Sequence, residues 1–167
     1  MLVGGWPGSG KSTLAAALGS QMGLPVLAKD EIKEALVEGL GQPSSVSESR
    51  RLGRAAVLAM LRVARRCPGA VLDSTWFDYT RPLAAALPGR VVEVRCVLPV
   101  ELAQSRYYAR AAHRQPGHLD LHRDKADLWG EPVLPLGVGP VVEVDTTVSP
   151  DLSAVTAEIL RAADEPS

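Results

Sequence analysis

The sequence predicts a three-layer α/β fold built on a five-stranded parallel sheet. Three observations predict it. Short apolar runs alternate with stretches of helical periodicity, Gly- and Pro-containing breaks separate them, and Asp residues follow several of the apolar runs. A strand–helix alternation favours parallel pairing, because a helix usually makes the crossover between parallel strands. Ligands of such sheets bind at the carboxyl ends of the strands.

The first half of the chain begins with a very short apolar strand, Met1 to Val3. Residues 11–22 have helical periodicity and stop at Gly23. A buried strand at 25–28 precedes a helix at 31–40, whose predicted apolar face is Ile32, Ala35, Leu36 and Leu40. The next helix spans residues 48–66, with Leu52, Ala55, Ala56, Ala59 and Val63 predicted to point inward.

The second half continues the alternation of strands and helices. The predicted elements are a strand at 70–73, a short helix at 81–87, a strand at 90–98, a helix from Pro99 to about Arg114, and a strand at 141–144. Ser149 and Pro150 are expected to cap a last helix that ends near residue 163. No linker divides the chain, so we expect one domain over 1–167 with a small helical lid at about 106–131.

Composition is that of a globular cytoplasmic protein. Apolar residues make up 46% of the 167 residues and charged residues 22%, and the net charge is −1. This balance gives no overall attraction to nucleic acid or to an anionic membrane. We expect no membrane association, because no signal peptide and no apolar run of about 18 residues is present. Cys67 and Cys96 have no metal-ligand spacing and fit reduced core residues.

A glycine-rich motif lies directly after the first strand. Residues 5–12 match G-x-x-x-x-G-K-[ST], the phosphate-binding loop (P-loop), between an apolar run and a helix. Backbone N–H groups of such a loop cradle phosphate oxygens at a helix N-terminus. The motif predicts ATP binding by Gly5, Pro7, Gly8, Ser9, Gly10, Lys11, Ser12 and Thr13, with Lys11 on the β- and γ-phosphates and Ser12 on Mg²⁺.

Two carboxylates follow predicted strands and are expected at the rim of the phosphate site. Asp73 follows Ala70 to Leu72 and has the position of an acid that holds Mg²⁺; capping the next turn is the alternative. Asp30 beside a γ-phosphate is electrostatically costly, which favours a catalytic role. As a base, Asp30 would take the proton of an acceptor hydroxyl; N-capping the following helix is its alternative role.

Arginines recur at four-residue spacing in the helix that follows the fourth strand. Arg106, Arg110 and Arg114 share one predicted face, and the three histidines lie at the end of this helix and just beyond it. Guanidinium groups there are expected to contact the phosphates of ATP, with Arg110 acting in catalysis. A solvated helix face is the alternative. The histidines at 113, 118 and 122 are expected to be polar groups of the lid rather than metal ligands.

An aromatic group, Trp76, Phe77 and Tyr79, follows Asp73. It could line an acceptor pocket or pack the loop, and the sequence favours neither.

These motifs resemble those of small P-loop kinases of the AAA_33 type, and are similar to those of chloramphenicol phosphotransferase, gluconate kinase and the kinase domain of polynucleotide kinase. The shared segments are 5–13, 29–32, 71–75, Arg106 to Arg114 with 116–118, and 145–147. The resemblance implies ATP as donor, Asp30 as base, Asp73 in positioning Mg²⁺ or the acceptor, lid arginines on the phosphates, and Thr146 in an adenine-side loop. The family phosphorylates varied acceptors, so the resemblance defines the reaction better than the substrate.

The sequence therefore predicts an ATP- and Mg²⁺-dependent kinase acting on a hydroxyl of a small molecule, such as an antibiotic, sugar or metabolite. Two alternatives stay open. A polynucleotide 5′-hydroxyl kinase would need a basic channel, for which the long helix offers Arg50, Arg51, Arg54, Arg62, Arg65 and Arg66. A nucleotide-binding regulatory or toxin-like module is the other, although such a module gains nothing from Asp30.

Overall fold

The computed structural model describes residues 1–111, 128–130 and 132–165. Its centre is a five-stranded, all-parallel sheet in the order β2-β3-β1-β4-β5. The strands are β1 (Leu2–Gly4), β2 (Val26–Ala28), β3 (Val71–Asp73), β4 (Glu93–Val97) and β5 (Val141–Asp145). The predicted fold class is confirmed, including the number and direction of the strands.

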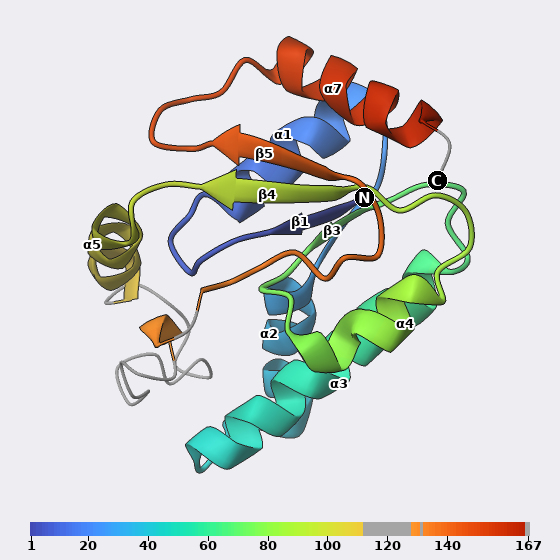
Figure 1. Cartoon of the computed structure of the whole chain (residues 1–167). Coiled ribbons are helices and arrows are strands. Elements are labelled where there is room, and N and C mark those ends of the chain that lie inside the picture. Colours follow the sequence, from blue (N-terminus) through green and yellow to red (C-terminus); the bar gives the residue numbers. More distant parts are fainter. Residues whose placement is uncertain (112–127, 131, 166–167) are drawn as a thin grey trace.

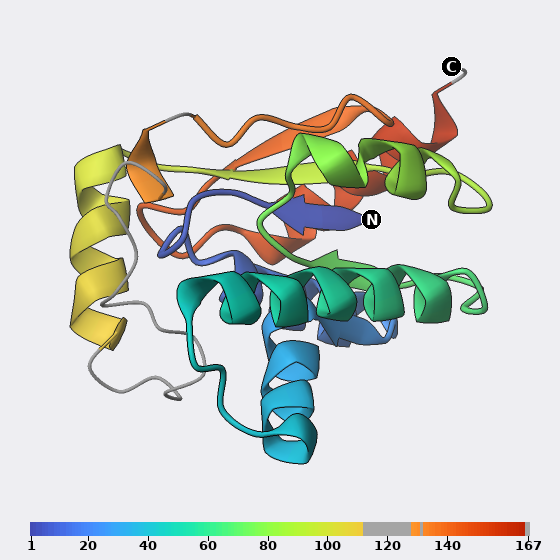
Figure 2. The same ribbon diagram turned by 90° about the horizontal axis from the view of Figure 1, so that it is seen from below.

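Helices cover both faces of the sheet (Figure 1). On one face lie α1 (Lys11–Met22) and α7 (Leu152–Asp164); on the other lie α3 (Val46–Ala64) and α4 (Arg81–Ala85), which the 3₁₀ turn η1 (Asp78–Thr80) precedes. α2 (Lys29–Leu40) packs against α3. α5 (Val100–Ala111) stands beyond the carboxyl ends of β4 and β5, as both views show (Figure 2).

Alternating residues of the strands divide the core into two layers. Val3 and Val71 belong to the cluster under α1 and α7, whereas their neighbours Leu2 and Leu72 belong to the cluster under α3 and α4. Successive side chains of a strand point to opposite faces, and a sheet buried on both sides therefore needs continuous apolar strands. The three-residue apolar runs are short, but each one supplies both layers.

Most predicted elements begin and end close to their predicted bounds. α1 spans residues 11–22, as predicted, and Gly23 closes it in the left-handed conformation at φ 63°. α2 begins at Lys29, two residues earlier than predicted, with Ala28 as its N-cap. The alternative role of Asp30 as N-cap is therefore wrong: Asp30 lies within the first turn. Asp151, rather than Ser149, caps α7, because its carboxylate accepts the N–H groups of Ser153 and Ala154.

The predicted buried faces of α2 and α3 were largely wrong. α2 buries Lys33 and Val37 and leaves Leu40 73% exposed. On α3, Val63 is 51% exposed, and the buried residues are Ser49, Ala56, Val57, Met60, Leu61 and Ala64. Both helices turn a mixed polar face toward each other and toward a cleft, and apolar periodicity alone does not find such a face.

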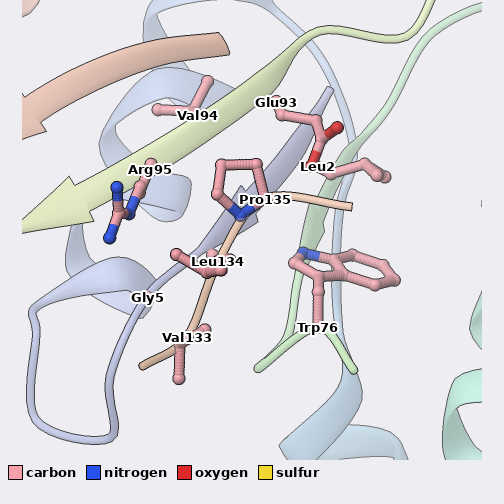
Figure 3. Close-up of a pocket in the computed structure, with 10 residues that line it drawn as sticks. Leu2, Gly5, Trp76, Glu93, Val94, Arg95, Val133, Leu134 and Pro135 are labelled. Carbon is pink, nitrogen blue, oxygen red and sulfur yellow. The ribbon is translucent and has the colours of Figure 1, made fainter. Parts of the chain in front are cut away.

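The segment 132–139 is fastened to the sheet by one buried carboxylate. Glu93, 4% exposed, accepts the N–H groups of Leu136 at 2.5 Å and Val138 at 2.8 Å. Figure 3 shows Val133, Leu134 and Pro135 lying beside β1, with Trp76 on one side and Arg95 on the other. The space left there is about 20 Å³, which is room for about one water molecule. This small cavity is therefore no ligand site.

Glu93→Gln is expected to lower the free energy of unfolding by about 2 kcal/mol, since hydrogen bonds to charged groups contribute about 1.5–3 kcal/mol. Each carboxylate oxygen of Glu93 accepts one N–H group, whereas glutamine has a single acceptor oxygen. Urea unfolding measures the change. The matched control is Glu143→Gln, which removes only the exposed ion pair with Arg95 and should cost less than about 1 kcal/mol. Equal losses in the two variants would show that the Glu93 hydrogen bonds do not hold the segment.

Among the helices that the structure describes, none combines the length and the apolar character needed to cross a bilayer.

Candidate functional site at the carboxyl ends of the strands

The P-loop motif forms the predicted strand–loop–helix unit between β1 and α1. Gly5, Gly8 and Gly10 have φ of 143°, 80° and 82°, a backbone region that favours glycine. A Cβ on Gly8 would lie 2.2 Å from the carbonyl oxygen of Ala103 in α5. The loop is thus packed closely against α5 and leaves the N-terminus of α1 open.

Four predicted site residues interact at this helix N-terminus. Burial lowers the pKa of Lys11, and the charges of Asp73 and Asp30 oppose that shift. Burial raises the pKa of Asp73, against the opposing effects of the Lys11 charge and a hydrogen bond from Ser12. The register explains the proximity of the two acids: Ala28 of β2 pairs with Asp73 of β3, and Asp30 follows two residues later.

Ser12 and Asp73 fit a Mg²⁺ site. Asp73 is 5% exposed, and its Oδ1 atom makes no hydrogen bond with any described group. Within the described ranges, no group of three or more His, Cys, Asp or Glu could hold a metal. Mg²⁺ in nucleotide sites is bound by one or two protein oxygens together with water and phosphate oxygens. A buried, unpartnered carboxylate oxygen beside a hydroxyl has the chemistry that such a site requires.

Asp73→Asn is expected to raise thermal stability at pH 7. The pKa of Asp73 is raised in the folded state, so ionisation of this carboxyl destabilises the fold. The destabilisation is absent below the pKa that Asp73 has in the unfolded chain and complete above the pKa that it has in the folded protein. Unfolding temperatures between pH 4 and pH 8 test this: the gain should shrink toward pH 4. Asp164→Asn, at an exposed residue, should change little. A variant less stable than wild type at pH 7 would contradict the prediction.

Asp30 lies in the first turn of α2, where the helix dipole favours negative charge. Its Oδ1 atom is 2.5 Å from the Nζ atom of Lys29, and both side chains are partly exposed, at 37% and 24%. The carboxylate is therefore accessible from the cleft and is held by a neighbouring cation. This arrangement suits a group that must meet a substrate hydroxyl.

A cleft of about 430 Å³ adjoins these residues, a volume typical of small-molecule sites. Its walls come from the P-loop and α1, from α2 and α3, from the segment after β3, and from α5. The lining residues outside the predicted site are Lys29, Lys33, Val46, Ser49, Arg50, Gly53, Arg54, Val57, Thr75, Phe77, Tyr79 and Tyr107. Figure 2 shows how the elements that carry these residues are arranged.

The aromatic group after β3 has two roles. Phe77 and Tyr79 line the cleft, their rings stacked with centroids 6.2 Å apart. Trp76 is 5% exposed and donates its indole N–H to the carbonyl of Val3 at 3.0 Å. Phe77 and Tyr79 thus line the cleft, whereas Trp76 packs the loop.

The arginines of α5 do not act as one row. Arg106 donates to the carbonyl oxygens of Thr146 and Thr147, each at 2.9 Å, so it fastens the loop after β5. Arg110 lines the cleft. Thr146 is buried, and both its N–H and its hydroxyl donate to the carbonyl of Val97. Arg114, the three histidines and most of the predicted lid lie outside the described residues.

Sequence reasoning missed Lys33 and Ser49 as site residues. The Nζ atom of Lys33 donates to Ser49 Oγ at 2.7 Å, and both residues line the cleft. Lys33 lies four residues after Lys29 and three after Asp30, so helical spacing could have placed it on the same face. Ser49 carries no comparable signal. Trp6 of the P-loop packs on Trp129, with the ring centroids 5.5 Å apart.

Solved structures with this architecture include several kinases. A putative kinase from Chloroflexus aurantiacus is 29% identical, covers 96% of each chain and superposes with a TM-score of 0.82. A gluconokinase from Sinorhizobium meliloti, 22% identical over 97% of this chain and 87% of its own, has a TM-score of 0.59. Shikimate kinase from Acinetobacter baumannii, 20% identical over 96% and 89%, has a TM-score of 0.57. Fold and P-loop together define a small P-loop protein of kinase architecture.

The chain belongs to the AAA_33 family, described as an AAA domain, which matches residues 1–126. Uncharacterized proteins of Mycobacterium tuberculosis and Mycobacterium bovis are 38% identical over an alignment of 126 residues, which covers 66% of this chain and 25% of theirs. The chain thus spans about a quarter of the length of these curated relatives.

Proposed function

We propose that this chain is an ATP-dependent phosphotransferase that phosphorylates a hydroxyl group of a small molecule. The observation that carries the proposal is the proximity of the buried Asp73 to Lys11 and Asp30, which line a cleft large enough for an acceptor. A P-loop alone supports nucleotide binding. The added, accessible carboxylate of Asp30 supports transfer to a hydroxyl.

Each residue of the site has a proposed part. Backbone N–H groups of residues 8–13 and the Lys11 ammonium bind the β- and γ-phosphates of ATP. Ser12 and Asp73 hold Mg²⁺, which neutralises charge on the phosphates when bound. Asp30 takes the proton of the acceptor hydroxyl, and Arg110, which lines the same cleft, balances charge on the transferred group.

Arg106 and Thr146 have a proposed part on the base side of the nucleotide. Arg106 holds the loop that begins with Thr146. This loop follows the carboxyl end of β5, and ligands of parallel sheets bind at the carboxyl ends of the strands. Arg106 therefore positions the adenine-side loop rather than the γ-phosphate. Its role in binding ATP is indirect.

The test is ADP release from Mg²⁺-ATP in the presence of hydroxylated antibiotics, sugars, sugar acids and nucleosides, with a 5′-hydroxyl oligonucleotide included. We expect at least one small acceptor to stimulate turnover, with formation of a phosphate monoester. Tight ATP binding without stimulation by any acceptor would favour the nucleotide-binding regulatory module. Stimulation by the oligonucleotide alone would favour the polynucleotide kinase.

A further inference from the structure

The wall of the cleft opposite the P-loop is made by α2 and α3 and carries three cations: Lys33, Arg50 and Arg54. On α3, the lining residues Arg50, Gly53, Arg54 and Val57 follow the spacing i, i+3, i+4, i+7 of one helix face. Lys33 faces them from α2 and is 5% exposed, with its ammonium on Ser49 Oγ. These three side chains form what we call the basic wall.

Charge at the cleft is strongly one-sided. Among its described lining residues, six are cationic and one, Asp30, is a carboxylate. Lys11 and Arg110 are accounted for by the phosphates of ATP in the proposed function, and Lys29 pairs with Asp30. The other three cations are those of the basic wall, on the α2 and α3 side of the cleft. The whole chain has a net charge of −1, so this local excess does not follow from composition.

Two features give the basic wall the character of a built site. Burying a lysine is costly unless a charge or a hydrogen-bond partner compensates, and the nearly buried Lys33 lies at the edge of a cleft rather than at the surface. The guanidinium carbon of Arg54 lies 5.4 Å from the centroid of the Tyr79 ring. A cation–π contact of this kind orients a long side chain. Arg54 is thus positioned beside Tyr79, one of the two aromatic residues after β3 that line the cleft.

We infer that the phosphoryl acceptor is a hydroxylated small molecule bearing an anionic group, a carboxylate or a phosphate, which the basic wall binds. The inference rests on the proposed function and names its acceptor class. The acceptor oxygen bonds to the γ-phosphorus of ATP, the bond from that phosphorus to the β–γ bridging oxygen breaks, and ADP leaves with that oxygen. Asp30 takes the hydroxyl proton. The anionic group, held on α2 and α3, fixes the orientation of the hydroxyl toward Asp30.

A nucleic-acid strand fits this wall less well than a small acid does. Of the six arginines on or directly after α3, only Arg50 and Arg54 line the cleft. Arg65 is eleven residues beyond Arg54, about 16 Å along a helix that rises about 1.5 Å per residue. A strand channel needs a continuous row of cations along its path. Two arginines and a lysine converging on one end of α3 favour a single anionic group.

The experiment measures ADP release with matched pairs of acceptors. Sugar acids and sugar phosphates are each compared with the neutral alditol of the same carbon chain, and a 5′-hydroxyl oligonucleotide is included. We expect kcat/KM for an acidic acceptor at least tenfold above that of its neutral partner. Which of the two acid series is phosphorylated distinguishes carboxylate from phosphate recognition.

Substitutions in the basic wall test whether these residues bind the anionic group of the acceptor. Arg54→Gln and Lys33→Met should each raise KM for the acidic acceptor about tenfold or more with a much smaller change in kcat. The loss with the neutral partner should be much smaller, because that acceptor lacks the anionic group that the basic wall binds. Arg62→Gln, on the same helix but outside the cleft, is the matched control and should behave as wild type. A loss confined to kcat, or an equal loss with both acceptors, would overturn the assignment of the basic wall.

Failure of this inference is distinguishable from failure of the proposed function. Preference for a neutral acceptor, or turnover of the oligonucleotide alone, overturns the anionic class while phosphoryl transfer stands. If no acceptor is phosphorylated, the proposed function loses its support, and the wall is tested by calorimetric binding of the same acids to protein loaded with Mg²⁺ and a non-hydrolysable ATP analogue. Binding lost in Arg54→Gln supports the anion site, and absence of binding by every acid overturns it.

Discussion

Replacement of Lys11 by alanine is expected to reduce phosphoryl transfer by about 10²–10³-fold, the loss typical of removing one group that stabilises charge in a transition state. Lys11 begins α1 where the P-loop ends, and the charges of Asp73 and Asp30 both act on its ammonium. The variant keeps the loop backbone but loses the cation that would lie on the β- and γ-phosphates. Single-turnover rates at saturating Mg²⁺-ATP measure the change in the transfer step.

Loss of activity in this variant should not come from loss of the fold. Burial lowers the pKa of Lys11, so keeping the ammonium charged costs stability below the folded pKa of this group. The unfolding temperature of Lys11→Ala at pH 7 should therefore equal or exceed that of wild type. Ser20→Ala, on the exposed side of the same helix, is the matched control for both measurements. Full transfer activity in Lys11→Ala would overturn the proposed function.

The fold was predictable because its signals are local. Each strand is a run of apolar residues long enough to supply both core layers, and the P-loop glycines and Gly23 mark where β1 ends and α1 begins and ends. The positions of Asp30 and Asp73 followed from the rule that ligands bind at the carboxyl ends of parallel strands. In the structure, the pairing of Ala28 with Asp73 brings the two acids close together.

The acceptor side of the site was not predictable in the same way. α2 and α3 cover one face only in part and also form the wall of a cleft, so their inward side combines Lys33 and Ser49 with Val37 and Val57. A search for apolar periodicity selects the wrong face of such a helix, as it did with Leu40 and Val63. Arg106 binds the loop after β5, whereas Arg110 lines the cleft. This difference depends on a loop that is remote in sequence from both arginines.

Replacement of Asp30 by asparagine is expected to separate ATP binding from phosphoryl transfer. A carboxylate near the γ-phosphate repels it, so removing the charge should leave ATP affinity unchanged or increase it. The transfer rate should fall by about 10²–10⁴-fold, the range that general-base catalysis contributes. Asparagine keeps the size of the side chain and its place in the first turn of α2. Calorimetric ATP binding and acceptor-stimulated ADP release measure the two properties separately.

The same variant distinguishes a base from a residue that only supports the local structure. A supporting role would weaken ATP binding and transfer together, because Lys29 loses its partner and the turn that carries both residues shifts. A base would leave binding intact and change only the rate, most strongly at the lower pH values, where acceptor hydroxyls are least ionised. Asp164→Asn, far along the sequence at the exposed end of α7, controls for removal of a charge. Unchanged turnover in Asp30→Asn would remove Asp30 from the mechanism. Asp30 is the one carboxylate among the described residues that line the cleft, so these residues would then offer no other carboxylate base for the acceptor hydroxyl.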